Sequence, residues 1–554
     1  MSPRVTQSRE CLPEQANEPE DLEARISGIR QQISVLQREL AGLEQRQRDR
    51  KRRQVLQRPG RSAASAQAQV NSQLRTLEGE SIHKLSQKGE LVLLGLLVLF
   101  ALVIRIYRLG SFPDTVLADE ADNAQSSIQI LYDHPPENGL FGFDWTPQPA
   151  FSVYKEAAFI SIFGFNIMAM RLPSALISTL ALIPFCMLLR RQFSIAASFL
   201  ATILLATNVW YLNFSHSGWN NIDICFYMLM AMLFLMWALD AIQASSERPW
   251  LKWVYFAASG FFCALGLYGY PSGRALSLAV AAFFPVAWFF NRSHFKTLLL
   301  GYVVLFAVEA AIFAPEGIYV ARNWEHFNGR SKVVIIFDNP DFKADPWGTM
   351  LKQLDWNVRG PWDGRVNNTP QYSPVGEPQL DRVTGLLALV GMALTLILRM
   401  LRSRSETWFW WLMLLTGWAL SQLITVGTPN GARGIGYMPT LIYFAGVGIE
   451  GIVLLLSQIS RKVSGVPIFR PLSFAAIIVI LLLAAYANIK HYVDWQNLPH
   501  TRQDRYIYVT AREFPDWSEH IAFRARNNQG TLNVGQWREL YPIEDRANPY
   551  GVSP

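Results

Sequence analysis

The stretch MRLPSALISTLALIPFCMLLRRQF (residues 170–193) is a long apolar run that leads into two adjacent arginines. About 20 apolar residues are enough to cross the hydrocarbon core of a bilayer as an α-helix. Paired arginines at the end of such a run favour the cytoplasmic side of the membrane. The stretch therefore predicts a membrane-spanning helix and the direction in which the chain runs through it.

The same pattern recurs along the chain. Of its 554 residues, 51% are hydrophobic and only 17% are charged, whereas soluble proteins carry nearer a quarter of charged residues. We predict a mainly α, polytopic membrane protein with about eleven transmembrane helices. They are expected at 90–107, 167–189, 194–212, 222–241, 252–269, 275–290, 297–314, 383–400, 407–425, 435–456 and 472–489.

Basic residues in the short connections predict the orientation. Connections such as Arg190–Arg191 and Arg292–Lys296 are basic, whereas NFSHSGWNN (213–221) contains neither lysine nor arginine. The positive-inside rule then places the N-terminus in the cytoplasm. The predicted transmembrane domain, 89–489, belongs to an inner or plasma membrane. Its long loops 108–166 and 315–382 and the tail 490–554 are expected on the extracytoplasmic face.

The N-terminal region differs in composition from the rest. Residues 1–20 are polar and expected to be disordered, and 51–88 form a basic linker. Between them, 21–50 are predicted to form a coiled-coil helix that makes a homo-oligomer, binds a cytoplasmic partner, or lies on the membrane surface. No aromatic or glycine pattern accompanies the basic residues, which argues against nucleic-acid binding. The heptad positions are Leu22, Ile26, Ile29, Ile33, Leu36, Leu40 and Leu43.

Three acids follow the first predicted span, in LADEADNAQ (117–125). Charge this close to lipid is costly unless it has a function or contacts water. One carboxylate is explained as a helix cap, favoured by the helix dipole, but three are not. Asp119, Glu120 and Asp122 are therefore candidates for catalysis or for lining a cavity at this face.

Two isolated arginines lie on the same predicted face, each in a Pro/Gly-rich turn. They are Arg274 in YGYPSGR (268–274) and Arg433 in GTPNGAR (427–433). A guanidinium can bind a phosphate through two hydrogen bonds, although an arginine at a span end can also snorkel to lipid headgroups. Polar residues of the neighbouring connections are expected to line the cavity. These are His216, Asn220, Tyr270 and Asn430.

Acids and arginines on one face suggest chemistry on a phosphorylated lipid. A carboxylate would act as general base towards an acceptor hydroxyl, and the arginines would stabilise the charge on the departing phosphate. Because the chain lacks a Walker or glycine-rich nucleotide motif, a lipid-linked sugar is the expected donor. The alternatives are a membrane transporter or lipid flippase, which would use carboxylates for ion coupling, and a non-catalytic membrane scaffold.

Four stretches carry a family resemblance. LADEADNAQ, the opening stretch, LYGYPSGRALSL (267–278) and GTPNGARGIGYMPTLIYFAGVGIEG (427–451) resemble the GT-C superfamily of membrane glycosyltransferases. The similarity is to the branch that contains protein O-mannosyltransferases and lipid A aminoarabinose transferases in bacteria and archaea. It implies an inverting hexosyl or pentosyl transferase that uses a polyprenyl-phosphate sugar, with Asp119 as base and Glu120 beside it. The acceptor would be a hydroxyl of a glycan, lipid or protein.

The resemblance also implies roles for residues in the long loops. Helices lying along the membrane are expected near 119–132 and 149–163. Gln148 stands where relatives have a phosphate-binding lysine, for which Lys155 is a substitute, and His216 stands where relatives often have arginine. The segment 314–341 would cap the donor cavity, with Tyr319, His326 and Arg330 as lining residues. No cofactor is required, although the acids of 119–122 are ligands suited to Mg²⁺ or Mn²⁺.

Overall fold

The computed structural model describes residues 86–132, 136, 138–144, 146–244, 248–366, 372–399, 405–462, 469–497, 509–510 and 514–526. The predicted disordered segment 1–20, the predicted coiled coil 21–50 and nearly all of the predicted basic linker 51–88 lie outside these residues. The coiled coil and its homo-oligomer or cytoplasmic partner therefore stay predictions.

Every predicted apolar segment is helical, but the predicted number of spans is not confirmed. Within the described chain, eight helical stretches are long and apolar enough to cross a membrane, or nine if the bent pair α8 (Ile195–Thr207) and α9 (Val209–Ser215) is one span. The segments predicted at 383–400 and 407–425 give shorter helices, α17 (Arg382–Leu394) and α18 (Ser405–Trp418). The eight contain α3 (Gln87–Ile106), α6 (Ile167–Leu180) with α7 (Leu182–Arg190), α10 (Asp223–Gln243), α11 (Leu251–Tyr268), α12 (Arg274–Phe290), α13 (Phe295–Arg322), α20 (Met438–Lys462) and α21 (Phe469–Gln496).

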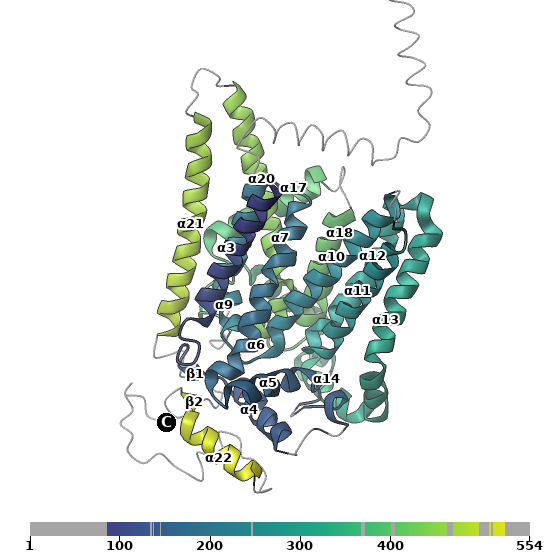
Figure 1. The fold of residues 1–554 in the computed structure, drawn as a ribbon, viewed down its shortest axis with the longest axis vertical. Coiled ribbons are helices and arrows are strands. Elements are labelled where there is room, and N and C mark those ends of the chain that lie inside the picture. The colour runs from purple at the N-terminus through teal and green to yellow at the C-terminus, as the bar shows by residue number, and fades with distance from the viewer. Residues whose placement is uncertain are drawn as a thin grey trace, which may run out of the picture. The chain divides into compact units, whose positions relative to one another are not determined.

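Connections predicted on the same side of the membrane contact one another. At one end of the spans, Arg191 Nη1 lies 2.7 Å from Asp240 Oδ2 and its Nε lies 2.7 Å from Glu406 Oε1. At the other end, which we call the loop end, Asn221 Nδ2 donates to the carbonyl of Ala432 at 3.0 Å. The long helices stand side by side, with the short helices α4 (Ala118–Leu131) and α5 (Phe151–Phe163) across their loop end (Figure 1). The alternating path agrees with the prediction, whereas which end faces the cytoplasm stays a prediction.

A buried arginine accompanies the bend between α8 and α9. The two helices meet at 60°, and the side chain of Asn208 accepts the N–H of Tyr211, which caps α9. Arg105 of α3 is fully buried there, and its Nη2 donates to the carbonyl of Ala206 at 3.0 Å. Backbone groups at a helix end lack hydrogen-bond partners within the helix. At the bend, Arg105 and Asn208 supply partners to such groups, which apolar surroundings could not do.

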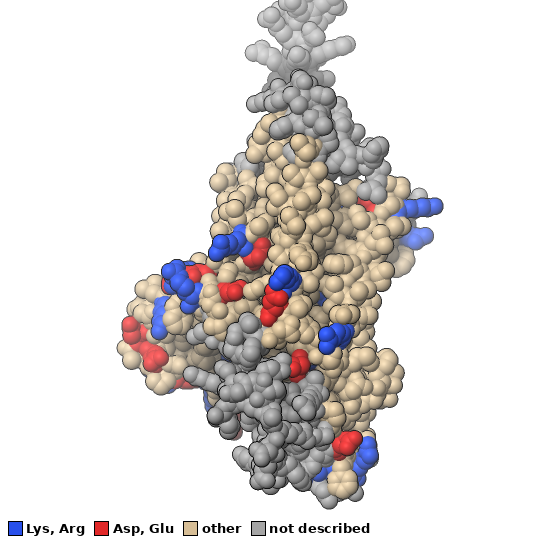
Figure 2. All heavy atoms as spheres, turned by 90° about the vertical axis from the view of Figure 1, so that its left-hand side faces the viewer, with Lys and Arg blue, Asp and Glu red and all other residues tan. Residues whose placement is uncertain are grey.

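The outer helices carry the surface expected of membrane spans. In the apolar windows of α3 and α21, only 17% and 22% of the residues are buried. The face drawn in Figure 2 is mostly uncharged, with acidic and basic side chains on a lobe at its left and others scattered at its centre and right edge. Exposed apolar residues on long helices are thus explained by contact with lipid.

The C-terminal part of the chain joins the loop end. Strand β1 (Thr115–Val116) pairs antiparallel with β2 (Val509–Thr510), and helix α22 (Phe514–Arg526) packs on α4 (Figure 1). A small apolar core forms between these elements and the starts of the spans, and it fixes the helix that carries the acid cluster. Its buried members are Val116, Ala121, Ala124, Ile128, Ile160, Ile167, Ala169, Met170, Phe514, Trp517 and Ile521.

Candidate functional site

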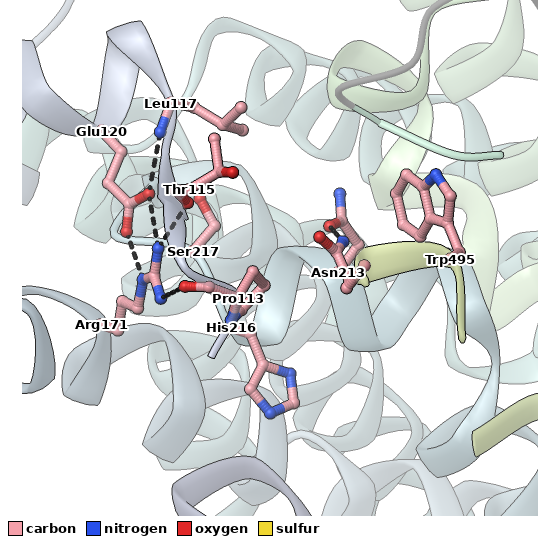
Figure 3. A pocket seen from close by; sticks show the side chains of 10 residues that line it. Pro113, Thr115, Leu117, Glu120, Arg171, Asn213, His216, Ser217 and Trp495 are labelled. Carbon is pink, nitrogen blue, oxygen red and sulfur yellow. Dashed lines mark hydrogen bonds and ion pairs between the residues drawn. The ribbon is translucent and has the colours of Figure 1, made fainter. Parts of the chain in front are cut away.

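Glu120 is an anchor of the acid-bearing helix. Its Oε1 accepts the Nε–H of Arg171 at 2.7 Å (Figure 3). The same oxygen accepts the backbone N–H of Gly218 at 2.8 Å. Arg171 in turn donates to the carbonyls of Pro113 at 2.6 Å and Thr115 at 2.8 Å. A buried carboxylate with its oxygens already occupied by donors has little capacity to accept a substrate proton. The geometry therefore favours a structural role for Glu120 over the predicted catalytic one.

Asp119 and Asp122 lie on other sides of α4, about 100° and 160° around the helix from Glu120. Residues three apart lie on the same face of a helix, and both side chains are half-buried. Burial, together with the neighbouring charge of Asp119, raises the pKa of Asp122 to about 6. The two carboxylates thus form a coupled pair at the N-terminal end of α4, where the helix dipole stabilises negative charge.

The connection 217–221 links the acid helix to both arginine turns. Gly218 accepts a hydrogen bond from Asn123 Nδ2 at 3.1 Å, which adds to its bond with Glu120.

The same connection also contacts the arginine turns. The Trp219 ring lies edge-on to Tyr270, at 6.3 Å between centroids. On the same connection, Asn220 Nδ2 donates to Ser152 Oγ at 2.9 Å, and Asn221 bonds the carbonyl of Ala432. The predicted lining residues Asn220 and Tyr270 therefore belong to one continuous set of contacts.

The two turns that carry the arginines lie side by side. The short helices η3 (Pro271–Gly273) and α19 (Gly431–Gly434) are in contact, and the Asn430 side chain caps α19 by accepting the Arg433 N–H at 3.0 Å. Arg433 Nη1 donates to the carbonyl of Val426 at 2.6 Å. The Arg274 guanidinium lies over the ring of Phe327, 4.5 Å from its centroid.

Neither of these arginines pairs with a carboxylate among the residues that the structure describes. Arg171, Arg190 and Arg191, by contrast, each form an ion pair. An arginine with unused donors that is not neutralised by an acid is suited to an anion such as phosphate. The prediction that Arg274 and Arg433 bind phosphate is thus compatible with their surroundings.

The other predicted phosphate-binding residues are less available. Lys155 forms an ion pair with Asp223 of α10, and Gln148 is buried at 4% exposure. Glu156 is likewise buried, and its Oε1 has no hydrogen-bond partner among the described residues. Burial, chiefly, raises the pKa of Glu156 well above its usual range. Lys155 would therefore have to give up its ion pair with Asp223 in order to bind a phosphate.

The capping segment contributes an aromatic cluster. Phe143 of the first loop contacts the rings of Tyr319 at 4.8 Å and His326 at 5.4 Å between centroids. Phe327, which covers Arg274, stacks on the same Phe143 at 6.0 Å. The segment therefore contacts the Arg274 side chain through Phe327. That it caps a donor cavity stays a prediction, and the side chain of Arg330 lies outside the described residues.

A small cavity opens beside Glu120 and Arg171 (Figure 3). Its volume of about 30 Å³ is enough for one or two water molecules but not for a sugar. His216 lies in its wall with Nδ1 facing the Leu212 carbonyl and Nε2 facing the Ile104 carbonyl. Burial lowers the pKa of His216 to about 4, which disfavours the positive charge that an arginine would carry at this position.

Two buried charged residues of this region, Arg171 and Glu316, were not among the site residues predicted from the sequence. Arg171 stands inside an apolar run, which is itself a sign of a buried partner, but the sequence does not say that the partner is Glu120. Glu316 of α13 is 0% exposed, and neither of its carboxylate oxygens has a hydrogen-bond partner in the described chain. Its place beyond the predicted end of the seventh apolar segment concealed it.

The acids of α4 do not fit a metal site. Within the residues that the structure describes, no three His, Cys, Asp or Glu side chains are grouped so that they could hold a metal ion. Glu120 in particular directs its oxygens to N–H donors of Arg171, Gly218 and Leu117. A Mg²⁺ or Mn²⁺ ion held by Asp119, Glu120 and Asp122 would require this network to open.

Fold and site define a multi-span membrane protein whose polar residues converge at the loop end. Residues 148–319 match the family model of dolichyl-phosphate-mannose-protein mannosyltransferases. The match covers under a third of the chain and extends from the first loop through most of α13. Over this stretch it confirms the resemblance to GT-C glycosyltransferases predicted from the sequence. No curated protein matches the chain.

Three solved structures of membrane glycosyltransferases are similar to the chain. The oligosaccharyltransferase AglB from Archaeoglobus fulgidus, in complex with an inhibitory peptide and a dolichol-phosphate, is 14% identical, with 75% of this chain and 58% of that chain covered and a TM-score of 0.49. ArnT from Cupriavidus metallidurans, bound to undecaprenyl phosphate, is 15% identical over 75% and 76% of the chains, with a TM-score of 0.43. The protein O-mannosyltransferase complex Pmt1–Pmt2 from S. cerevisiae, bound to the sugar donor, is 18% identical over 47% and 37%, with a TM-score of 0.34. The chain thus spans little more than half the length of the oligosaccharyltransferase.

Proposed function

We propose that the chain is an inverting glycosyltransferase that moves a hexose or pentose from a polyprenyl-phosphate donor to an acceptor hydroxyl on the extracytoplasmic face. The match of residues 148–319 to a lipid-linked mannosyltransferase family carries the proposal. The matched stretch contains Lys155, Arg171 and Arg274, together with the connection 217–221 that contacts α4. The acceptor is a glycan, a lipid or a protein of the cell envelope.

In the proposed reaction, Asp119 acts as the general base, and Arg274 and Arg433 act on the leaving phosphate. Asp119 takes the proton of the acceptor hydroxyl, whose oxygen attacks the anomeric carbon of the donor. The bond from that carbon to the phosphate oxygen breaks, and the phosphate leaves with the electron pair. Arg274 and Arg433 stabilise the growing charge. Attack on the side opposite the leaving group inverts the anomeric carbon.

Transfer from radiolabelled undecaprenyl-phosphate sugars tests the assignment of the base. With purified protein in lipid vesicles and a cell-envelope extract as acceptor source, Asp119→Asn is expected to lower the rate about 10²- to 10⁴-fold. Glu325→Gln, which changes an exposed acid in helix α14 (Trp324–Val334), is the matched control. Undiminished transfer by Asp119→Asn would remove this residue from the mechanism. Loss of transfer in Asp122→Asn alone would assign the base to Asp122 instead.

The arginines are tested by conservative replacement. Arg274→Lys and Arg433→Lys keep the charge but lose the planar fork that binds phosphate through two hydrogen bonds. Both are expected to raise the KM for the lipid-linked donor, and unchanged values for both would contradict their proposed role. Mass spectrometry of envelope glycans from a strain that lacks the protein would identify the sugar and the acceptor.

A membrane transporter or lipid flippase is the second candidate, and buried acids in α13 favour it. Glu309 and Glu316 lie seven residues apart, so they share a face of the helix, and they are 5% and 0% exposed. Acids within spans often serve proton or ion coupling. A fluorescent-lipid translocation assay on vesicles with Glu316→Gln separates the two functions, because the proposed enzyme keeps sugar transfer in this variant whereas a coupled transporter loses translocation.

A further inference from the structure

Helix α16 (Pro346–Arg359) lies outside the predicted spans and has three distinct faces. One face packs on the segment that leads to the Arg433 turn. On it, Gln353 Nε2 donates to the carbonyl of Thr425 at 3.4 Å, and Asn357 Nδ2 donates to Thr428 Oγ1 at 2.9 Å. Asn357 is only 2% exposed, so this face is fixed to the protein.

The second face is apolar and uncovered by the described chain. Trp347 is 80% exposed, Leu351 62%, Leu354 41% and Val358 52%. Their spacing of four, three and four residues places them in one stripe along the helix. Large apolar side chains arranged in this way on a helix indicate a surface that binds lipid or another protein.

The third face is charged. Arg359 forms an ion pair with Asp355, one turn before it, and Lys352 lies over the ring of Trp356 at 4.5 Å from its centroid. At 100° per residue, these charged residues lie on one side of the apolar stripe and Gln353 and Asn357 lie on the other. The order around the helix is therefore protein contact, apolar stripe and charge.

This order is the one required of a helix that lies at a membrane surface beside its own protein. One side contacts the protein, the apolar side contacts the acyl chains and the charged side contacts water. The position of α16 relative to the apolar helices supports lipid as the partner that contacts the stripe. Its packed face contacts η8 (Ala419–Leu423), which continues the apolar helix α18, so α16 lies where that apolar segment ends. Tryptophan, here Trp347, is also typical of the membrane interface.

We propose that α16 is an interfacial helix whose stripe of Trp347, Leu351, Leu354 and Val358 inserts into the lipid leaflet at the loop end. The lipid contact goes beyond the proposed glycosyl transfer and does not depend on it. If the transfer is correct, α16 also holds the Arg433 turn, through Thr425 and Thr428, at the level of lipid phosphates.

Spin labels on single cysteines test the lipid contact without any activity assay. Labels at Leu351→Cys and Leu354→Cys probe the stripe, and labels at Lys352→Cys and Asp355→Cys are the matched controls on the charged face. The background is Cys11→Ser, since Cys186, Cys225 and Cys263 are buried. The protein is reconstituted in nanodiscs of phosphatidylethanolamine and phosphatidylglycerol, and collision with O₂, which concentrates in lipid, is compared with collision with a water-soluble nickel chelate.

The expected result is a ratio of O₂ to nickel accessibility several-fold higher at the stripe than at the controls. Equal ratios at all four positions would show that the stripe faces water and would overturn the proposal. Stripe labels reached by neither reagent would overturn it as well, because they would show that a second copy or another protein covers the stripe. All four positions are at least partly exposed, so the substitutions leave the packed face intact.

Discussion

Arg171 and Glu120 form a buried ion pair, in which Nε lies 2.7 Å from Oε1 and each side chain is 1% exposed. Removal of one partner from such a pair leaves a buried charge without compensation. Arg171→Met is therefore expected to lower the free energy of unfolding by about 3–5 kcal/mol. The midpoint of thermal unfolding in detergent, followed by tryptophan fluorescence, measures the loss.

The pair Arg190–Glu90 at the opposite end of the spans gives the control. Its side chains are 27% and 30% exposed, and partly exposed ion pairs contribute only about 0–1 kcal/mol. Arg190→Met should therefore shift the unfolding midpoint much less. Equal shifts in the two variants would contradict the structural role assigned to the Glu120 anchor.

Gly218→Ala is expected to destabilise the same anchor by crowding. A Cβ at position 218 would lie 3.0 Å from Glu120 Cγ and 3.2 Å from its Oε1, and overpacking of this kind typically costs about 1–3 kcal/mol. Gly95→Ala in α3 is the matched control, because no heavy atom lies within 4 Å of a Cβ there. Thermal unfolding should show a loss for Gly218→Ala and no loss for Gly95→Ala. A neutral Gly218→Ala would indicate that Glu120 can move aside without cost.

The raised pKa of Asp122 predicts a pH-dependent stability. A carboxyl group whose pKa is about 6 in the folded state and about 3.9 in the unfolded chain holds a proton that the unfolded chain releases between these values. Its contribution to stability is complete below about pH 4 and is lost as the pH rises through 6. Asp122→Asn should therefore be more stable than the parent above pH 6, and the difference should shrink towards pH 4.

The measurement is the unfolding midpoint of both proteins at intervals from pH 4 to pH 8. Because other groups titrate in the same range in both proteins, only the difference between them reports on Asp122. A difference that stays constant with pH would show that position 122 affects stability without titrating.

Lys155→Met should destabilise the protein through its partner. Asp223 is 3% exposed, and without Lys155 it would be a buried charge with no opposite charge beside it. The double variant Lys155→Met/Asp223→Asn removes that charge and is expected to recover most of the lost stability. A double variant no more stable than Lys155→Met would show that the lysine stabilises the protein by packing and not by its charge. In that case Lys155→Arg, which keeps the charge, is also expected to lower the stability.

Much of this architecture was predictable because it depends on local patterns. The helix expected at 119–132 is α4, 118–131, and the helix expected at 149–163 is α5, 151–163. Hydrophobic runs and basic connections also predicted which joints meet at the loop end. These features follow from composition and spacing over one or two turns, which the sequence displays directly.

The features that escaped prediction depend on contacts between distant segments. The sequence shows three acids at 119–122 but cannot tell that Glu120 faces Arg171 and the other two do not. It shows one apolar run at 194–212, whereas the structure bends it by 60° where Arg105 binds Ala206. Helix α13 continues to Arg322, beyond the predicted 314, since tertiary packing extends the helix past the end of its apolar run.

The pairing of β1 with β2 joins a loop that is synthesised early to a strand that is synthesised after all the spans. Thr115 pairs with Thr510, and Phe514 and Trp517 complete the small core beneath α4. Because a chain emerges from the ribosome N-terminus first, the loop made earliest waits for a strand made after every span has been inserted. A translation product that stopped before Val509 would contain its spans but lack Phe514, Trp517 and Ile521 of the small core. Premature termination should therefore yield a membrane-bound product in which α4 is less firmly held.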